Sequence, residues 1–294
     1  MKRTAHIQEL REMITGEKRR GRRIAFIPTM GYLHKGHLAL IEQARKTDAF
    51  VVASIFVNPL QFGPTEDLAR YPRDLERDAQ LLATAGVDVL FHPSVEEMYP
   101  GPMLTFVEVK ELADMLCGTA RPGHFRGVAT VVNKLFNIVQ PDMAFFGQKD
   151  YQQYLIIKRM VRDLSLPIEI FPVPIMREDD GLAMSSRNVY LTPEQRQEAL
   201  VLFKSLNLAE ETIRAGERGA RALEEQIKEK ISLESQGVID YVEVRDANDL
   251  SEVTEITGPV IVALAVKFGT TRLIDNKVVE VDHYVQNDDE IKNS

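Results

Sequence analysis

Cysteine is almost absent from this sequence of 294 residues, in which Cys117 is the single example. One thiol cannot form an intrachain disulfide, and a cysteine-rich metal site is excluded as well. A lone cysteine is far more often a packed side chain than a nucleophile, so we expect Cys117 to be structural. The chemistry of the chain is therefore expected to come from other residue types.

Long apolar runs and an excess of basic charge are also missing. No stretch approaches the ~20 apolar residues of a membrane helix, and residues 1–10 mix charges without the apolar segment of a signal peptide. Lys and Arg number 36 against 44 Asp and Glu, which gives a formal net charge of -8. Binding to a phosphate backbone is driven by Lys and Arg, so this balance disfavours it. We expect a cytoplasmic protein with no membrane and no nucleic-acid partner.

The apolar segments that are present alternate with helical patterns. Short runs rich in β-branched and aromatic residues are separated by amphipathic stretches, which is typical of a parallel sheet with crossover helices. The runs are apolar throughout, as in strands buried on both faces. The sequence therefore predicts a Rossmann-like, doubly wound α/β domain. The expected strands are Ile24–Pro28, Phe50–Val57, Val87–Phe91, Met143–Phe146 and Ile168–Val173, and the expected helices are His37–Lys46, Arg73–Ala85, Val128–Val139 and Tyr151–Leu164.

The character of the sequence changes after Arg177. A polar segment and a small-residue stretch lead into two charged amphipathic helices, and further strand-like segments follow. We therefore expect two domains, residues 1–176 and a smaller α+β lid domain at 177–294, with a frayed tail at 288–294. The expected elements of the second domain are the helices Pro193–Ala215 and Ala220–Leu233 and the strands Ile239–Arg245, Val260–Val266 and Arg272–Ile274.

The strongest functional signal is the segment from Ile27 to His37, which leaves the first expected strand and enters the first helix. In open parallel sheets ligands bind beyond the carboxyl ends of the strands, and a helix N-terminus offers free N–H groups to a phosphate. Gly31 and Gly36 would let a ligand approach the backbone closely. His34 and His37 are three residues apart, a spacing that lets both face a triphosphate. The competing interpretation is that two histidines merely cap a helix and face solvent.

Two further segments place polar side chains directly after expected strands. Asn58 and Gln61 follow the second strand, where amides can donate to and accept from a hydroxy acid, although an Asn-Pro pair is also an ordinary turn. Lys149 precedes a helix and is a cation suited to phosphates. Asp150 beside it is interpreted either as a helix cap or as a ligand contact.

Two loops add arginine and histidine to the list of candidates. The loop at 184–187 ends in Arg187, whose planar donor fork suits phosphate, and it is interpreted either as a closing lid or as a plain linker. His124 lies in a glycine-containing loop, flanked by Arg121 and Arg126. An exposed loop histidine and a substrate contact are equally compatible with that position.

Several of these segments resemble a known family. His34-Lys35-Gly36-His37 is similar to the signature of the HIGH nucleotidyl-transfer superfamily, which includes class I aminoacyl-tRNA synthetases and cytidylyltransferases. A bare four-residue match is weak, but the ten residues from Pro28 to His37 resemble the pantothenate synthetase family specifically. The agreement continues through nearly the whole chain, at Phe56–Gly63, Arg121–Val128, Phe145–Gln153, Met184–Asn188 and Arg272–Asn276.

The resemblance implies an enzyme that condenses (R)-pantoate with β-alanine, using ATP and passing through a pantoyl-adenylate, with release of pyrophosphate and AMP. It also implies Mg²⁺ with the ATP and a homodimer, whereas the metal ligands stay unassigned. The implied catalytic residues are His34, His37, Lys149 and Arg187, and the implied pantoate or β-alanine contacts are Gln61 and Gln153. The implied ATP-binding residues are Met30, Gly31, Tyr32, Leu33, His34, Lys35, Gly36, His37, Gly147, Gln148, Lys149, Asp150, Met176, Met184, Ser185, Ser186 and Arg187.

Two other functions are also compatible with these residues. Another nucleotidyltransferase with the same signature, such as a cytidylyltransferase, would keep the nucleotide in its product, whereas the implied ligase releases AMP and forms an amide. A non-catalytic ATP-binding module on the same fold is the second alternative, since fold alone does not fix function. Such a module has no need for cations on three separate loops, and turnover of ATP would exclude it.

Overall fold

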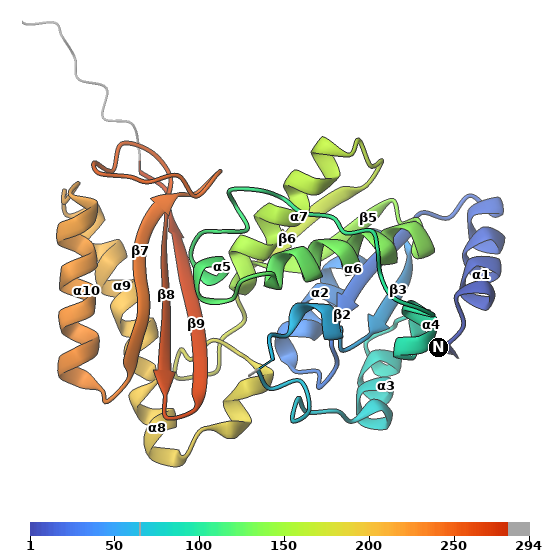
Figure 1. Ribbon diagram of the computed structural model, residues 1–294, viewed down its shortest axis with the longest axis horizontal. Helices are drawn as coiled ribbons and strands as arrows, with labels where there is room; N and C mark the ends of the chain where they lie inside the picture. The colour runs from blue at the N-terminus through green and yellow to red at the C-terminus, as the bar shows by residue number, and fades with distance from the viewer. Residues whose placement is uncertain (65, 282–294) are drawn as a thin grey trace, which may run out of the picture. The chain divides into compact units, whose positions relative to one another are not determined.

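The computed structural model describes residues 1–64 and 66–281 (Figure 1). Contacts within the chain divide it into two compact units, Met1–Arg196 and a second one that begins at Gln197. By this division the segment 177–196, which the sequence led us to place in the smaller domain, belongs to the first unit. The frayed tail expected at 288–294 lies outside the described residues.

The first unit contains a six-stranded sheet in the order β1-β4-β3-β2-β5-β6. All neighbouring strands run parallel, which confirms the predicted doubly wound α/β fold. Five of the strands are the expected ones, and the short edge strand β1 is an addition. The bounds are β1 Lys2–Thr4, β2 Ile24–Thr29, β3 Phe50–Ile55, β4 Val89–Phe91, β5 Met143–Gly147 and β6 Glu169–Val173.

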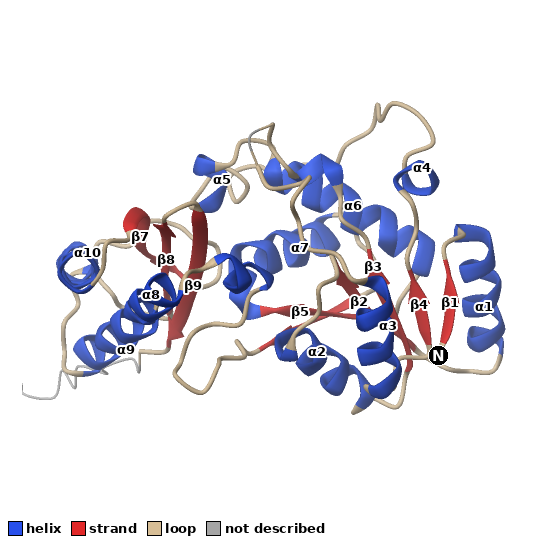
Figure 2. Cartoon of the chain, turned by 90° about the horizontal axis from the view of Figure 1, so that it is seen from below, coloured by secondary structure: helices blue, strands red, loops and turns tan. Residues whose placement is uncertain are grey.

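Helices cover both faces of this sheet, with α2 and α3 on one face and α6 and α7 on the other (Figure 2). His124, which the sequence suggested lies in a loop, is the first residue of α6, because Gly123 adopts a left-handed conformation (φ 80°) and starts the helix early. The helices of this unit are α1 Ile7–Arg19, α2 Lys35–Arg45, α3 Leu75–Thr84, α4 Val95–Met98, α5 Cys117–Ala120, α6 His124–Val139 and α7 Tyr151–Asp163, with short 3₁₀ turns η1 Pro59–Gln61, η2 Gln148–Asp150 and η3 Ser186–Tyr190.

The central strand β2 explains why the expected strands are apolar throughout. Ala25 and Ile27 belong to the core beneath α2 and α3, whereas the Phe26 ring packs edge-on against Phe136 of α6, with ring centroids 6.4 Å apart. Successive strand residues point to opposite faces, so a strand that is covered on both sides must be apolar at every position.

The chain changes the direction in which it builds the sheet between β2 and β5. After β2 the strands β3 and β4 are added on one side, and β5 and β6 are then added on the other. The loops that follow β2 and β5 therefore diverge at the carboxyl ends of two neighbouring strands. Such a topological switch point is where doubly wound sheets bind their ligands.

The second unit contains a three-stranded antiparallel sheet, β7-β8-β9, together with helices, as the sequence predicts. The stripe Leu223, Ile227 and Ile231 buries one face of α10 in this unit at helical spacing. The single helix expected at 193–215 is divided near Ala199. Helix α8, Pro193–Glu198, spans the division at Arg196. The elements that lie wholly within the second unit are α9 Leu200–Arg214, α10 Ala220–Glu234, β7 Val238–Asp246, β8 Val260–Phe268 and β9 Thr271–Val279.

Among residues 1–64 and 66–281, no helix has the length and apolar character that crossing a membrane requires.

Candidate active site

A cavity of about 230 Å³ lies at the switch point, within the first unit. The structure brings most of the expected site residues to its wall, although their roles in binding and catalysis stay predictions. The expected residues that line it are Met30, His34, Gly36, His37, Gln61, Gly147, Lys149, Asp150, Gln153, Met176, Met184, Ser185, Ser186 and Arg187. Five expected ATP-binding residues, Gly31, Tyr32, Leu33, Lys35 and Gln148, are not among the lining residues.

The turn between β2 and α2 is held by a buried carboxylate that the sequence did not single out. Asp78 of α3 accepts hydrogen bonds from the backbone N–H groups of Tyr32 at 2.6 Å and Leu33 at 2.8 Å. Tyr32 has φ 50° and Gly31 has φ 84°, so the turn needs such support. Burial raises the pKa of Asp78, against the lowering effect of these N–H donors and of Arg77. Asp78 and Tyr32 are 46 residues apart, so no local sequence pattern could indicate this contact.

His34 and His37 cap α2 and line the cavity at the same time. The Nδ1 atom of His34 accepts the N–H of Gly36 at 3.1 Å, and Nδ1 of His37 accepts the N–H of His34 at 3.3 Å. The two rings lie 4.1 Å apart between centroids. The capping interpretation and the ligand interpretation of this pair are therefore compatible, because capping uses only one nitrogen of each ring.

The surroundings keep both imidazoles neutral. Burial, followed by the charge of Lys149, lowers the pKa of His34 to about 4. Burial, His34 and Lys149 lower the pKa of His37 to about 3. A neutral imidazole whose Nδ1 accepts a hydrogen bond carries its proton on Nε2. Each ring consequently offers one Nε2–H donor that the cap does not use.

Gly36 is required at its position for a steric reason. A Cβ atom there would lie 2.8 Å from Cε1 and 2.9 Å from Nδ1 of His34, closer than real Cβ contacts. The missing side chain thus makes room for the His34 ring across the first turn of α2. The glycine of the His-x-Gly-His pattern serves the placement of the first histidine.

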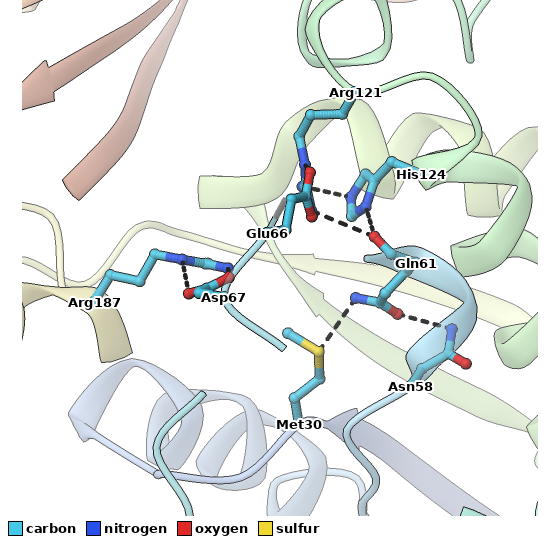
Figure 3. A network of polar contacts seen from close by, with 8 residues as sticks. All are labelled: Met30, Asn58, Gln61, Glu66, Asp67, Arg121, His124 and Arg187. Carbon is cyan, nitrogen blue, oxygen red and sulfur yellow. Dashed lines mark hydrogen bonds and ion pairs between the residues drawn. The ribbon is translucent and has the colours of Figure 1, made fainter. Parts of the chain in front are cut away.

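A chain of amides forms another part of the wall (Figure 3). The carboxamide nitrogen of Gln61 donates to the Met30 sulfur at 3.2 Å, and its oxygen accepts from Nδ2 of Asn58 at 3.1 Å. Asn58 in turn donates to the carbonyl of Gly127 and accepts from the hydroxyl of Tyr99 at 2.8 Å. Gln61 is 8% exposed. This network fixes the orientation of the Gln61 amide before any ligand binds.

Arg121, His124 and Glu66 form a connected polar cluster beside Gln61 (Figure 3). Nδ1 of His124 donates to the backbone oxygen of Gln61 at 2.7 Å, because a carbonyl can only accept. Burial and then Arg121 lower the pKa of His124 to about 4, so the ring is neutral and its Nε2 accepts from Arg121 at 3.0 Å. The structure thus favours a cavity contact for His124 over an exposed loop position.

Arg187 is engaged by an acidic residue from a distant part of the sequence. Its Nε and Nη2 donate to the two carboxylate oxygens of Asp67, both at 3.1 Å, and its guanidinium lies 5.7 Å from the centroid of the Tyr71 ring. Ser186 beside it donates to the backbone oxygen of Tyr32 at 3.2 Å. The loop at 184–187 is therefore tied to the segment around Asp67 and to the histidine-bearing turn.

Lys149, Asp150 and Gln153 reach the cavity from the turn after β5 and the first turn of α7. Asp150 occupies the N-cap position of α7 but makes no side-chain capping bond. Its carboxylate is the one acidic side chain among the described residues that line the cavity. Within residues 1–64 and 66–281 no group of three or more His, Cys, Asp and Glu side chains could hold a metal ion.

Fold and cavity together define a class: a Rossmann-like α/β protein with a cavity at its switch point that is lined by a His-x-Gly-His turn and by cations from other segments. Comparison with known proteins narrows this class. Residues 2–278 match the family described as pantoate-beta-alanine ligase. The chain belongs to this family and is a ligase.

Individual relatives agree along almost their full lengths. Pantothenate synthetase of Desulfitobacterium hafniense is 65% identical over 274 residues, which cover 93% of this chain and 97% of the relative. The protein of the same name from Acetivibrio thermocellus is 58% identical over 275 residues, 94% and 98% of the two chains.

Solved structures show the same likeness in three dimensions. Pantothenate synthetase from Thermus thermophilus superposes with a TM-score of 0.90 at 48% identity, over 94% of this chain and 99% of that one. Pantoate-beta-alanine ligase from Francisella tularensis, complexed with beta-gamma ATP and beta-alanine, gives 0.79 at 34% identity, over 95% and 97%. The predicted family and fold class are thereby confirmed.

Proposed function

We propose that this chain condenses pantoate with β-alanine in an ATP-dependent reaction that passes through a pantoyl-adenylate. The observation that carries the proposal is the convergence of two neutral histidines, Lys149 and Arg187 on one cavity at the switch point, in a chain of this family. Cations and N–H donors that are fixed before the reaction are what phosphoryl transfer requires, since catalysis there is mainly positioning and charge stabilisation.

In the first half-reaction a carboxylate oxygen of pantoate bonds to the α-phosphorus of ATP, and the bond to the departing pyrophosphate breaks. The attacking carboxylate carries no proton and the leaving pyrophosphate is an anion, so hydrogen-bond donation matters more than proton transfer. With pKa values of about 4 and about 3, His34 and His37 are neutral at physiological pH and act as Nε2–H donors. Lys149 and Arg187 supply positive charge beside the phosphates.

In the second half-reaction the neutral amine of β-alanine attacks the pantoyl carbonyl carbon. The new C–N bond forms as the bond between the pantoyl carbon and the AMP oxygen breaks, and the nitrogen loses one proton to solvent water. Gln61 and Gln153 hold the pantoyl group for this attack. The Gln61 amide is held in place by Asn58 and Met30, which reduces the ordering that binding requires.

Mg²⁺ accompanies the ATP in this proposal and neutralises phosphate charge when bound. It commonly keeps several waters and takes one or two protein carboxylates together with phosphate oxygens. The Asp150 carboxylate on the cavity wall fits that donor set and would be its protein ligand. A homodimer in the cytoplasm completes the proposal, on the strength of the family resemblance alone.

The identity of the products tests this function against its alternatives. Purified protein with pantoate, β-alanine and Mg²⁺-ATP should release AMP and pantothenate in equal amounts. A product that retains the nucleotide would indicate a nucleotidyltransferase such as a cytidylyltransferase. Binding of ATP with no turnover under any substrate combination would indicate a non-catalytic module.

A further inference from the structure

We propose that Arg121 receives the carboxylate of β-alanine and thereby selects the amino-acid substrate, an inference that rests on the proposed function. The second half-reaction creates the need for such a residue. β-Alanine differs from a simple amine by a carboxylate that stays ionised and lies two methylenes from the reacting nitrogen. Recognition of that group calls for a cation that the nucleotide does not occupy.

Position singles out Arg121 among the cations of the cavity. Arg121, Lys149 and Arg187 line it within the described part of the chain. Lys149 lies in the turn after β5, and Arg187 lies in the 184–187 loop, both of which we assign to the phosphates. Arg121 instead approaches the backbone oxygen of Gln61, to which its Nη2 donates at 3.4 Å. It therefore stands on the acyl side of the cavity, where the amine must arrive.

Glu66 shows how a carboxylate binds to this guanidinium. Its two oxygens accept from Nε and Nη2 of Arg121 at 2.7 and 2.6 Å, a two-pronged geometry that suits a planar fork. The side chains are 19% and 23% exposed, so the pair lies largely out of water and an unpaired charge there would be costly. Glu66 thus neutralises Arg121 while the amino acid is absent. When β-alanine binds, its carboxylate replaces that of Glu66 at the guanidinium.

His124 fixes the direction of the guanidinium. Its Nε2 accepts from Nη1 of Arg121, and its Nδ1 donates to the Gln61 carbonyl. Nη1 is therefore held by His124, while the Nε and Nη2 edge, whose Nη2 also reaches the Gln61 carbonyl, is the edge that binds the Glu66 carboxylate and that the substrate carboxylate would take over. Because Arg121 and His124 both bind the main chain of Gln61, the carboxylate receptor and the acyl-binding amide belong to one rigid cluster (Figure 3).

The test compares Arg121→Gln with Arg126→Gln. Arg126 lies five residues further along in the first turn of α6, is exposed, and has its guanidinium 5.1 Å from the centroid of the Phe106 ring without lining the cavity, so it is a matched control. For Arg121→Gln we expect the KM for β-alanine to rise by about 10²-fold, as for loss of a buried charge partner. Pyrophosphate–ATP exchange, measured without β-alanine, should retain most of its rate. Arg126→Gln should behave as the parent in both assays.

Selectivity and a second variant make the test independent of a folding defect. The parent should strongly prefer β-alanine to propylamine, which lacks the carboxylate, and Arg121→Gln should lose most of that preference. Glu66→Gln, which removes the competing charge, should lower the KM for β-alanine several-fold.

Three results would overturn the assignment: an unchanged KM for β-alanine in Arg121→Gln, an exchange rate that falls as far as amide synthesis, or a raised KM in Glu66→Gln. Absence of exchange in the parent protein would instead refute the proposed function itself.

Discussion

The backbone N–H of His34 donates a hydrogen bond to Nδ1 of His37 at 3.3 Å, so the first histidine of the motif fixes the tautomer of the second. Both rings then present Nε2–H to the cavity as neutral groups. The hydrogen bonds that cap the start of α2 therefore also orient the two Nε2–H donors of His34 and His37.

Acid should destabilise the protein through its buried histidines. His34, His37 and His124 have pKa values of about 4, 3 and 4 in the folded chain, below the ordinary 6.5. Between pH 6.5 and about 4 the unfolded chain therefore binds more protons than the folded one, and the free energy of unfolding falls as the pH falls. At pH values well above the ordinary histidine pKa, these residues are neutral in both states and do not make the free energy of unfolding depend on pH.

The measurement is urea unfolding of the parent and of His37→Gln at several pH values from about 4.5 to about 7.5, a range that spans the ordinary histidine pKa. The variant should show a shallower dependence of the free energy of unfolding on pH than the parent. Parallel curves for the two proteins would mean that His37 titrates alike in the folded and unfolded states.

Gly36→Ala should reduce the rate of adenylate formation although the helix itself tolerates alanine. The added Cβ meets the His34 ring at 2.8 Å and must push it from its place. A misplaced donor typically costs about 10²-fold or more in rate. Gly16→Ala in α1 is the control, since nothing lies within 4 Å of its Cβ and alanine stabilises a helix by ~0.5–1 kcal/mol. Parent-like single-turnover kinetics in Gly36→Ala would contradict the steric account.

Substitution by alanine should affect binding at Gln153 and stability at its neighbour Gln152. Gln153 lines the cavity, so Gln153→Ala should raise the KM for pantoate, at a cost of ~1–3 kcal/mol in binding, with little change in the thermal midpoint. Gln152 is buried and bonds to the backbone of Leu112, Met115 and Cys117, so Gln152→Ala should mainly lower the thermal midpoint. Gln61→Ala should also raise the KM for pantoate, and it should remove the hydrogen bond that Asn58 donates to the Gln61 amide. An equal loss of ATP and pantoate affinity in Gln153→Ala would argue against its placement at the acid.

His37→Ala and Lys149→Ala should slow adenylate formation by about 10²–10³-fold, the usual effect of deleting a donor to developing charge. Loss of the His37 cap should cost only ~1 kcal/mol, a minor part of the ~5–15 kcal/mol by which domains are stable. Thermal midpoints and single-turnover rates separate the two effects. Early melting of His37→Ala, with parent-like rates in its folded fraction, would leave His37 a structural residue.

Local patterns are sufficient for five of the six strands of the parallel sheet and for the histidine turn. Ile24–Thr29 is apolar because both of its faces are covered, and the glycines mark the turn directly. The edge strand Lys2–Thr4 gives no such signal, since three residues with two exposed charged side chains show no apolar alternation. The apolar pattern predicts too late a start for α6, because the left-handed backbone of Gly123, and not an apolar residue, begins the helix.

The parts of the site that sequence reasoning missed are contacts between distant segments. Glu66 and Arg121 are 55 residues apart, and Asp67 and Arg187 are 120 apart. No local sequence pattern indicates which arginine Glu66 or Asp67 contacts, so only the folded structure shows these two ion pairs. Asp78 is hidden in the same way, because it sits in an ordinary helix and serves a turn elsewhere.

Isotope exchange tests the central claim most directly. Parent protein with Mg²⁺-ATP, pantoate and labelled pyrophosphate, but no β-alanine, should form labelled ATP, because adenylate formation is reversible and precedes the amine. Omission of pantoate should abolish the exchange. Steady production of pantothenate and AMP, together with exchange that appears only when β-alanine is present, would contradict a separate pantoyl-adenylate step in this cavity.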